Sequence, residues 1–311
     1  MAFIQAFGAY VPQRIVSNAE LAARLGCDPD WISQASGIAE RRFAAEEESV
    51  ADLAVRAAQD CLARAGRAAV DVQLILVATG SEPRRFPGAA SVVAYRLGLR
   101  DGVPAIDVPV ASAGSLVGMI VGNALAATYP VILIVAAEKM SSLVLREPLD
   151  RNIAILFGDG AGACLLDAKR GAARIVDHAL HSDGAFAGSL ALQADGTLFM
   201  DGRSVILHAS RKLPRAIAEV LERNQVSAAD VPVFLMHQAN QNLMDAVARA
   251  LRVPADRFFS NIRNYGNTSS ASLFVAAAEW QAGGGFQSGA PAVFAAFGAG
   301  FHWGALLAVG V

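Results

Sequence analysis

Apolar residues follow a helical period in some segments of the chain and form unbroken runs in others. Residues 49–66 (SVADLAVRAAQDCLARAG) show the helical period, and Gly66 stands where such a helix would end. The face that this period predicts to be buried consists of Leu53, Ala57, Ala58, Cys61 and Leu62. The next run, residues 70–80 (VDVQLILVATG), is largely apolar, which favours a strand covered on both faces. Alternation of such helices and strands is typical of an α/β fold.

The same order of elements returns in the second part of the chain. A predicted helix over residues 212–225 leads into the apolar run 229–240, whose DVPVFLM has the pattern of DVQLILV in the first part. Residues 157–166 (FGDGAGACLL) are echoed by residues 297–307 (FGAGFHWGALL). We interpret the first of these two as a tight, close-packed turn, because it lacks the spacing of a phosphate-binding loop. Turn residues predict a loop over 181–198.

Two apolar helices with small residues at their starts are predicted at residues 112–127 and 268–281, one in each part. Corresponding elements lie roughly 140–160 residues apart, which is too long a period for a solenoid repeat. The chain is therefore predicted to consist of two similar α/β halves, residues 1–170 and 171–311. Because small residues would let the two helices approach closely, functional residues are expected where the halves meet.

Composition argues against several classes of protein. Of the 311 residues, 54% are hydrophobic and 17% charged, and the formal net charge of −2 offers no general attraction to nucleic acid. Cys27, Cys61 and Cys164 are far apart, which argues against a zinc site or a disulfide framework. The start lacks a signal-peptide pattern, and no run of about 18 apolar residues could span a membrane. We expect a cytoplasmic protein with no metal site and no nucleic-acid or membrane partner.

Three polar residues are candidates for the chemistry of this chain. Ser112 follows an apolar run and precedes an apolar helix, whose N-terminus would stabilise negative charge; the alternative is an ordinary N-cap serine. His237, in FLMHQAN, ends a predicted strand, where it is either functional or a buried core histidine. Asn267, in NYGNTSSAS, precedes the second apolar helix, where it is either functional or an ordinary capping residue.

With these three residues in this order, the chain resembles β-ketoacyl-acyl-carrier-protein synthase III, a family of thiolase-fold condensing enzymes. The likeness runs from end to end. It is carried by GAYVPQRIVSN (8–18), DWI and SGIAERR (30–42), FPGAA (86–90), DVPVASAG (107–114), LDRNIAILFGDGAGA (149–163), HSDG (181–184), PVFLMHQAN (232–240), YGNTSSAS (265–272) and FGAGFHWG (297–304). The resemblance implies an α/β, thiolase-like fold of two duplicated βαβαβαββ halves in a five-layer αβαβα arrangement.

The same resemblance implies roles for the candidate residues. Ser112 stands where the family has a cysteine that takes an acyl group from a coenzyme A thioester. His237 and Asn267 match the pair that binds the thioester carbonyl of malonyl-carrier protein and stabilises the enolate formed on decarboxylation. The backbone N–H groups of Ser112 and Ala299 would form the oxyanion hole of the acyl step. No cofactor is expected, because coenzyme A enters with the acyl-CoA substrate; the second substrate is malonyl-CoA or a malonyl-acyl carrier protein.

Further positions match residues that hold substrates in the family. Trp31 and Arg151 match the pair that encloses the adenine of coenzyme A. Phe157 matches a residue that lines the site, and Asn240 is expected to bind substrate beside His237. Phe86 matches a residue that reaches the acyl pocket of a second subunit, which implies a homodimer.

The chain departs from the family at the nucleophile and at the docking surface. A serine hydroxyl is less acidic than a thiol and needs a base within hydrogen-bond reach. Ala35, Leu207 and Asn242 stand where the family has basic residues near the entrance and at the carrier-protein contacts.

Three hypotheses about the function follow. The first is a ketosynthase of fatty-acid or specialised, polyketide-like biosynthesis, with Ser112 native or engineered in place of cysteine. The second is an acyltransferase with Ser112 as nucleophile and His237 as base, without decarboxylation. The third is a silent partner of an active ketosynthase.

Overall fold

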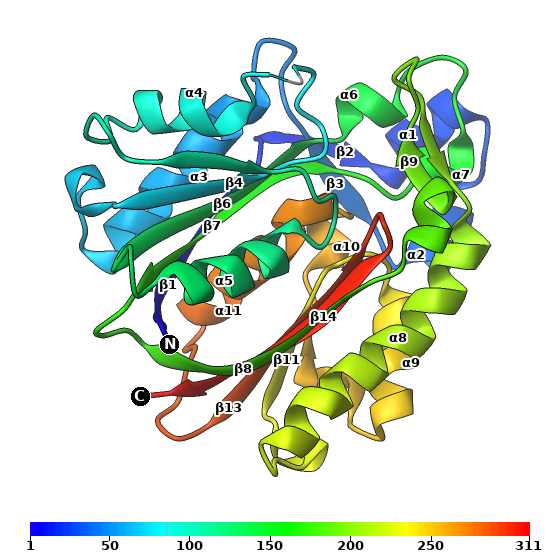
Figure 1. Ribbon diagram of the computed structural model, residues 1–311. Helices are drawn as coiled ribbons and strands as arrows, with labels where there is room; N and C mark the ends of the chain where they lie inside the picture. Colours follow the sequence, from blue (N-terminus) through cyan, green and yellow to red (C-terminus); the bar gives the residue numbers. More distant parts are fainter. Residues whose placement is uncertain (85) are drawn as a thin grey trace.

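A mixed sheet runs through the whole molecule and joins two similar halves (Figure 1). The computed structural model describes residues 1–84 and 86–311. Along that part of the chain the strand order is β12-β11-β13-β14-β8-β1-β7-β6-β4-β5. The strands of the first half are β1 (Phe3–Tyr10), β4 (Leu74–Ala78), β5 (Ala105–Val108), β6 (Val131–Lys139) and β7 (Asp159–Asp167). Those of the second half are β8 (Ala173–Ser182), β11 (Val233–Met236), β12 (Phe258–Phe259), β13 (Pro291–Gly298) and β14 (His302–Gly310).

Helices connect these strands in the same order in both halves. In the first half they are α3 (Val50–Ala65), α4 (Ala89–Arg96) and α5 (Gly114–Leu125). In the second half they are α8 (Gly202–Arg223), α9 (Gln241–Leu251) and α11 (Ser272–Ala282). Each half is a βαβαβαββ unit, and the strand order β5-β4-β6-β7-β1 corresponds to β12-β11-β13-β14-β8. The predicted duplication is confirmed, and one unit gives way to the next between β7 and β8.

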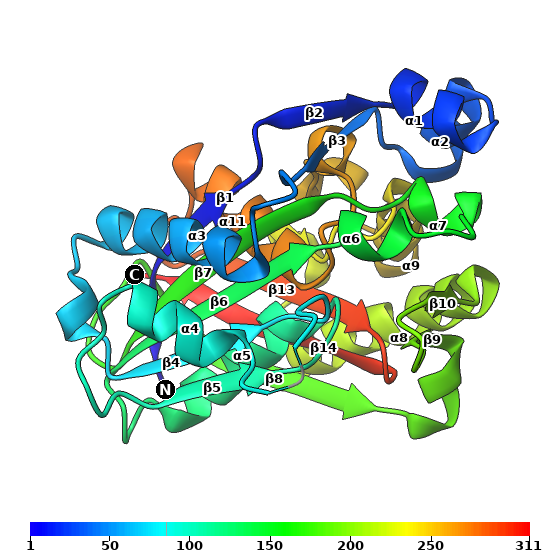
Figure 2. The same cartoon turned by 90° about the horizontal axis from the view of Figure 1, so that it is seen from above.

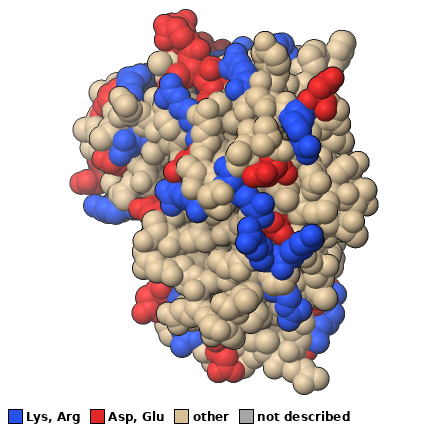
Figure 3. Space-filling view, turned by 90° about the vertical axis from the view of Figure 1, so that its left-hand side faces the viewer, with Lys and Arg blue, Asp and Glu red and all other residues tan. Residues whose placement is uncertain are grey.

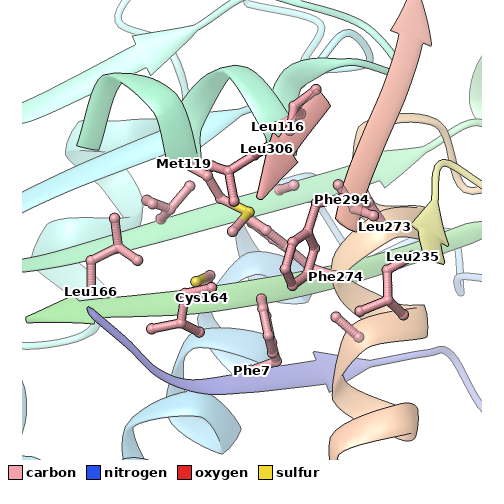
Figure 4. Packing of buried hydrophobic residues seen from close by; sticks show 14 of the residues in the cluster. Phe7, Leu116, Met119, Cys164, Leu166, Leu235, Leu273, Phe274, Phe294 and Leu306 are labelled. Carbon is pink, nitrogen blue, oxygen red and sulfur yellow. The ribbon is translucent and has the colours of Figure 1, made fainter. Parts of the chain in front are cut away.

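Helices α5 and α11 lie between the two halves of the sheet (Figures 1 and 2). Helices α3 and α4 cover the outer face of one half, and α8 and α9 cover that of the other. In the central layer, the ring of Phe7 lies 5.9 Å from that of Phe274 and 5.7 Å from that of Phe294, beside Leu116 and Met119 (Figure 4). A helix that is apolar all round belongs in such a core. The result is the five-layer αβαβα fold that the resemblance implies.

The start of α5 packs closely against both halves. A Cβ atom at Gly114 would lie 2.8 Å from the Cβ of Ala78 and 3.2 Å from the Cβ of Ser270. Because glycine has no side chain, α5 can begin against the end of β4 and against the segment that precedes α11. The expected close approach of the two apolar helices at their starts is confirmed.

Segments inserted between the repeated elements gather over one end of the sheet (Figure 2). They are β2 (Arg14–Ser17), α1 (Asn18–Leu25), α2 (Pro29–Ser36), β3 (Glu40–Phe43), α6 (Ser141–Val144), α7 (Arg151–Ala154), β9 (Leu190–Leu192), β10 (Leu198–Met200) and α10 (Ile262–Tyr265). The parallel strands β4, β5 and β11 finish at this end. Open α/β sheets bind their ligands outside the carboxyl ends of such strands.

Helix α3 forms for the reasons that its pattern suggests. The Ser49 hydroxyl accepts a hydrogen bond from the N–H of Asp52 at 3.2 Å, and the Asp52 carboxylate accepts one from the N–H of Ser49 at 2.9 Å. This reciprocal pair satisfies two donors that the first turn leaves free. Gly66 ends the helix with a φ of +61°, in the region that favours glycine. The five predicted core residues are all buried.

Three predicted segments differ from the structure. Helix α8 begins at Gly202 rather than at residue 212, because the side chain of Asp201 caps it by accepting the N–H of Ser204 at 3.0 Å. The loop predicted over 181–198 contains β9, which pairs with β10. The glycine-rich segment read as a turn is the strand β7. A Cβ at Gly162 would lie 2.5 Å from that of Phe274, so this glycine lets α11 lie against the strand.

Charged side chains of both signs are mixed on the face shown in Figure 3, with a group of basic side chains near its middle. On the outer helices, the ion pairs Arg64–Asp60 and Arg96–Asp52 each have an N···O distance of 2.8 Å. In the described part of the chain, no helix is both long enough and apolar enough to cross a membrane.

Candidate active site

Ser112 lies in the turn between β5 and α5. Its φ is +65°, which a residue with a side chain rarely adopts. The N-cap of α5 is Ala113, so Ser112 is not the capping serine that the pattern alone allows. A Cβ at Gly298 would lie 2.1 Å from the carbonyl oxygen of Ala111, so this glycine lets the end of β13 pack against the turn. Close packing thus holds a strained residue in place, as is common at functional sites.

His237 directly follows β11, as the sequence predicts, and is only 4% exposed. Burial lowers its pKa from 6.5 to about 4, so the imidazole is neutral at pH 7. Its Nδ1 lies 2.6 Å from the hydroxyl oxygen of Ser272, which also accepts the N–H of Gln238 at 3.0 Å. Among the described residues, Nδ1 is the acceptor within reach of the Ser272 hydroxyl hydrogen. This network assigns the imidazole hydrogen to Nε2.

Hydrogen bonds hold both the backbone and the side chain of Asn267. Its N–H donates to the carbonyl of Leu156 at 2.9 Å, and its carbonyl accepts the N–H of Gly158 at 3.0 Å. Its side-chain Oδ1 accepts the N–H of Ser269 at 2.8 Å, which assigns the other branch of the amide as Nδ2. Nδ2 makes a long contact of 3.4 Å with the carbonyl of Ala239. One of its two hydrogens therefore stays available to a ligand.

A cavity of about 420 Å³ reaches all three residues. Trp31, Phe157 and Asn240 also line it, and most of the remaining wall is apolar: Ile153, Ile155, Leu156, Leu190, Met200, Val205, Ile206, Ala209, Leu213, Met236, Leu243 and Phe297. The exposed Arg203 also lines this cavity. Such a pocket, apolar with a few polar groups that converge, is typical of a small-molecule site.

A second, smaller cavity of about 60 Å³ adjoins the first at Ser112, Phe157 and Leu190. Its other lining residues are small or apolar, with one hydroxyl: Gly80, Ala111, Met140, Leu143, Ala191, Leu192, Leu198, Ser269 and Ala299. Ser112 thus stands between a large cavity and a small chamber.

The remaining candidate residues differ in their contacts and in whether they line these cavities. The guanidinium of Arg151 lies 5.7 Å from the ring centre of Trp31, and their enclosure of the adenine of coenzyme A stays a prediction. The Asn240 amide donates to the carbonyl of Ala35 at 2.9 Å, and its side chain caps α9. Phe86 is 88% exposed and lines none of the cavities described in its own chain.

The oxyanion hole expected from Ser112 and Ala299 stays a prediction. Ala299 lines the small chamber with Ser112, but the Ser112 N–H donates to the hydroxyl oxygen of Ser269 at 3.1 Å. A substrate oxygen would have to replace this partner. Among the described residues, the Ser112 hydroxyl itself makes no hydrogen bond.

Sequence reasoning missed the polar residues behind the site. Ser269 and Ser272 lie within the GNTSSAS motif, where they were indistinguishable from capping serines. Glu138 is fully buried at the end of β6. Its signal was available, because a carboxylate that closes an apolar run such as VILIVAAEK is costly to bury without partners.

Comparison with known proteins supplies the context for this geometry. Residues 106–184 match the family model described as 3-oxoacyl-[acyl-carrier-protein (ACP)] synthase III, and residues 221–309 match its C-terminal counterpart. The chain is 35% identical to the β-ketoacyl-[acyl-carrier-protein] synthase III of Oleidesulfovibrio alaskensis, over 98% of both chains. It is 37% identical to that of Ruegeria sp. (strain TM1040), over 96% of both.

Two solved structures are similar to this chain over nearly its whole length. The 3-oxoacyl-[acyl-carrier-protein] synthase III of Aquifex aeolicus is similar with a TM-score of 0.94 and 31% identity, over 99% of this chain and 100% of that one. The priming β-ketosynthase of the R1128 polyketide biosynthetic pathway is similar with a TM-score of 0.91 and 28% identity, over 100% of this chain and 96% of that one.

Proposed function

The chain belongs to the 3-oxoacyl-[acyl-carrier-protein] synthase III family, and on that premise we propose that it condenses an acyl group with a malonyl thioester, with loss of carbon dioxide. The observation that carries the proposal is a pair of N–H donors on two residues that line one cavity, Nε2–H of His237 and Nδ2–H of Asn267. Fatty-acid or polyketide biosynthesis is the setting that the relatives' names support.

Decarboxylation needs these two donors. When the bond between the malonyl carboxylate and its α-carbon breaks, carbon dioxide leaves and the electron pair passes to the thioester as an enolate. Donors that already point at the enolate oxygen stabilise it without reorganisation, and loss of one such donor typically costs about a hundredfold to a thousandfold in rate. His237 is suited to this role because its lowered pKa keeps it neutral, with its hydrogen on Nε2.

Ser112 is the proposed acyl acceptor. Its oxygen attacks the carbonyl of an acyl-CoA, the carbon–sulfur bond breaks, and coenzyme A leaves as the thiol after taking up the serine proton. The enolate carbon then attacks the carbonyl of the seryl ester and the bond from that carbonyl to the serine oxygen breaks. The serine oxygen takes up a proton from solvent, and the 3-oxoacyl thioester leaves. The chamber beside Ser112 supports a short acyl group, because its 60 Å³ has room for roughly four to six water-sized groups.

Acyl transfer without decarboxylation is the second candidate, and the hydroxyl at position 112 favours it, because an oxygen ester is a poorer acyl donor to a carbanion than a thioester. It requires His237 as a base. The hydrogen-bond network argues against that role, because the Ser272 hydroxyl engages Nδ1 and leaves Nε2 protonated. In both candidates the proton of Ser112 therefore passes to the departing sulfur of coenzyme A, and only the condensation gives the donor pair of His237 and Asn267 a function. In the described part of the chain, no hydrogen bond joins the Ser112 hydroxyl to His237.

The proposal includes partners at two surfaces. A malonyl-carrier protein, rather than malonyl-CoA, is favoured by Arg203 at the cavity and by the exposed Arg211 and Arg215 further along α8, because carrier proteins are acidic. A second copy of the chain is favoured by the exposed edge strand β5 and by Phe86. A cytoplasmic location is part of the same proposal. The free thiols of the three cysteines favour this location, because free thiols persist in a reducing compartment.

The decisive experiment separates the two half-reactions. The native chain and Ser112→Ala are incubated with a panel of acyl-CoAs and examined by intact-protein mass, and carbon dioxide release from malonyl-carrier protein is followed separately. We expect an acyl adduct that Ser112→Ala loses, and carbon dioxide release that depends on His237 and Asn267. An adduct and acyl transfer without carbon dioxide release would establish the second candidate instead. Absence of both activities would leave a silent partner.

A further inference from the structure

Glu138 is a buried carboxylate that the proposed reaction does not use. Its side chain is fully buried near the end of β6. Its carboxylate oxygens accept hydrogen bonds from the hydroxyls of Thr79, Ser81, Ser269 and Ser270 and from the N–H groups of Gly80 and Ser270, at 2.6–3.3 Å. Among the described residues it forms no ion pair, and the adjacent Lys139 ammonium binds carbonyls of residues 45, 46 and 48 instead. Burial of a carboxylate is costly, and here the hydrogen bonds that offset the cost also fix the orientation of each donor.

One of these donors connects Glu138 to Ser112. The Ser269 hydroxyl donates its single hydrogen to Glu138 Oε1 at 3.0 Å. Its oxygen is then free to accept, and it accepts the N–H of Ser112 at 3.1 Å. The order Glu138–Ser269–Ser112 is therefore directional: the carboxylate fixes the hydroxyl, and the hydroxyl fixes the amide of the strained turn before a substrate oxygen replaces it.

The same serine also connects Glu138 to Asn267. The Ser269 N–H donates to Asn267 Oδ1 at 2.8 Å, the contact that assigns the other branch of the Asn267 amide as the donor Nδ2. Ser269 has a φ of +48° and Ser112 a φ of +65°, so both hold a conformation that side chains rarely adopt. Such conformations persist only where surrounding contacts determine them.

We propose that Glu138 and Ser269 form a buried relay that sets the position of Ser112 relative to Asn267, and that both are positioning residues of the condensation. The inference rests on the proposed roles of Ser112 and Asn267. Ser269 holds Ser112 through its side chain and Asn267 through its backbone. The relay therefore aligns the acyl acceptor with one of the donors that generate the attacking carbon.

Two neighbouring serines provide a matched pair of variants. Ser269→Ala removes the hydroxyl that links Glu138 to Ser112 and keeps the backbone N–H that binds Asn267. Ser270→Ala removes an equally buried hydroxyl from the same carboxylate oxygen, 2.6 Å away, and this hydroxyl has no contact with Ser112 or Asn267 in the hydrogen bonds of the described residues. Thermal unfolding of both variants establishes that they fold.

The first readout does not depend on the enzymatic reaction. Each variant is combined with Ser112→Cys, and the rate of thiol alkylation by iodoacetamide is measured from pH 6 to 9. We expect Ser269→Ala to raise the pH midpoint and to lower the rate at pH 7 about tenfold, because a thiolate displaced from the helix N-terminus is less stabilised. Ser270→Ala should change the rate less than twofold. Equal effects of the two substitutions, or faster alkylation in Ser269→Ala, would show the proposal to be wrong.

The second readout separates the two half-reactions in the chain with Ser112 intact. Ser269→Ala should slow formation of the acyl adduct about tenfold and leave carbon dioxide release from malonyl-carrier protein within about threefold, since Asn267 keeps its partner. Glu138→Gln should slow both half-reactions, because the NH₂ group of the glutamine would face hydroxyl and N–H donors that now donate to the carboxylate. If the unmodified chain forms no adduct and releases no carbon dioxide, the proposed function fails, while the alkylation comparison still decides whether the relay positions residue 112.

Discussion

His237 owes its chemical character to two features of its surroundings. Burial lowers the pKa of the imidazole to about 4, and the Ser272 hydroxyl at 2.6 Å from Nδ1 decides which nitrogen carries the hydrogen. Residue type and position were readable from HQAN, but neither feature was, because both depend on what packs around the ring. At this scale the structure turns a candidate histidine into a neutral hydrogen-bond donor.

Removal of the Ser272 hydroxyl tests the tautomer. In Ser272→Ala the hydrogen of His237 is free to occupy either nitrogen, so we expect carbon dioxide release from malonyl-carrier protein to fall about tenfold, the effect of losing roughly 1.4 kcal/mol of transition-state stabilisation. Ser182→Ala is the matched control, because it removes a hydroxyl 2.8 Å from Nδ1 of His302, which lines neither of the two cavities at Ser112. Similar losses in both variants would contradict the assignment.

The lowered pKa of His237 also makes a prediction about stability. Between pH 6.5 and about 4 the unfolded chain binds a proton at this residue and the folded chain does not, so the free energy of unfolding decreases as the pH falls. The contribution is complete above pH 6.5, and about 2 kcal/mol of it is lost at pH 5. Urea unfolding at pH 7 and pH 5 should therefore give a smaller loss of stability for His237→Gln than for the native chain. Equal losses would mean that this histidine titrates normally.

Among the elements, β7 departs furthest from its local sequence. Its DGAGA start has the composition of a turn, yet it forms a strand between β1 and β6. The reason lies outside the strand, in the closeness of α11 at Gly162. Helix α3, by contrast, carries its own capping box and terminal glycine and was predicted nearly to the residue. Elements with local start and stop signals are readable; elements held by their neighbours are not.

Substitution of Gly162 tests this account of β7. In Gly162→Ala the new Cβ would meet the side chain and backbone of the helix, so we expect the free energy of unfolding to fall by about 2 kcal/mol. Gly184→Ala serves as control, because a Cβ there has no neighbour within 4 Å. Chemical denaturation measures both. A Gly162→Ala chain as stable as Gly184→Ala would refute the close packing as the cause.

The outer strand of the first half presents an apolar side chain at the edge of the sheet. Strand β5 is an edge of the sheet and its Ile106 is 46% exposed. Charges on an edge usually prevent pairing, but the carboxylate of Asp107 in β5 is engaged within the chain by the N–H of Ala90 at 2.8 Å. We expect the chain to form a homodimer through this edge and Ile106→Lys to shift it toward monomer in sedimentation equilibrium. Leu180→Lys is the control, since Leu180 is 39% exposed on the interior strand β8. A native chain that is monomeric, or an Ile106→Lys chain that remains dimeric, would exclude this interface.

The amino-acid sequence alone established the alternation of helices and strands, the duplication, the family resemblance and the order of Ser112, His237 and Asn267, because each of these is written in short, contiguous patterns. It left open what each of those residues can do. Ser112 and Ser269, whose hydrogen bond holds the turn, are 157 residues apart in the chain, and Ser269 and Glu138 are 131 apart. The packing of two halves against two central helices brings such partners together, and no local sequence pattern encodes this packing. The glycines at 114, 162 and 298 also depend on the tertiary structure, because the atoms that would clash with a side chain there belong to other elements.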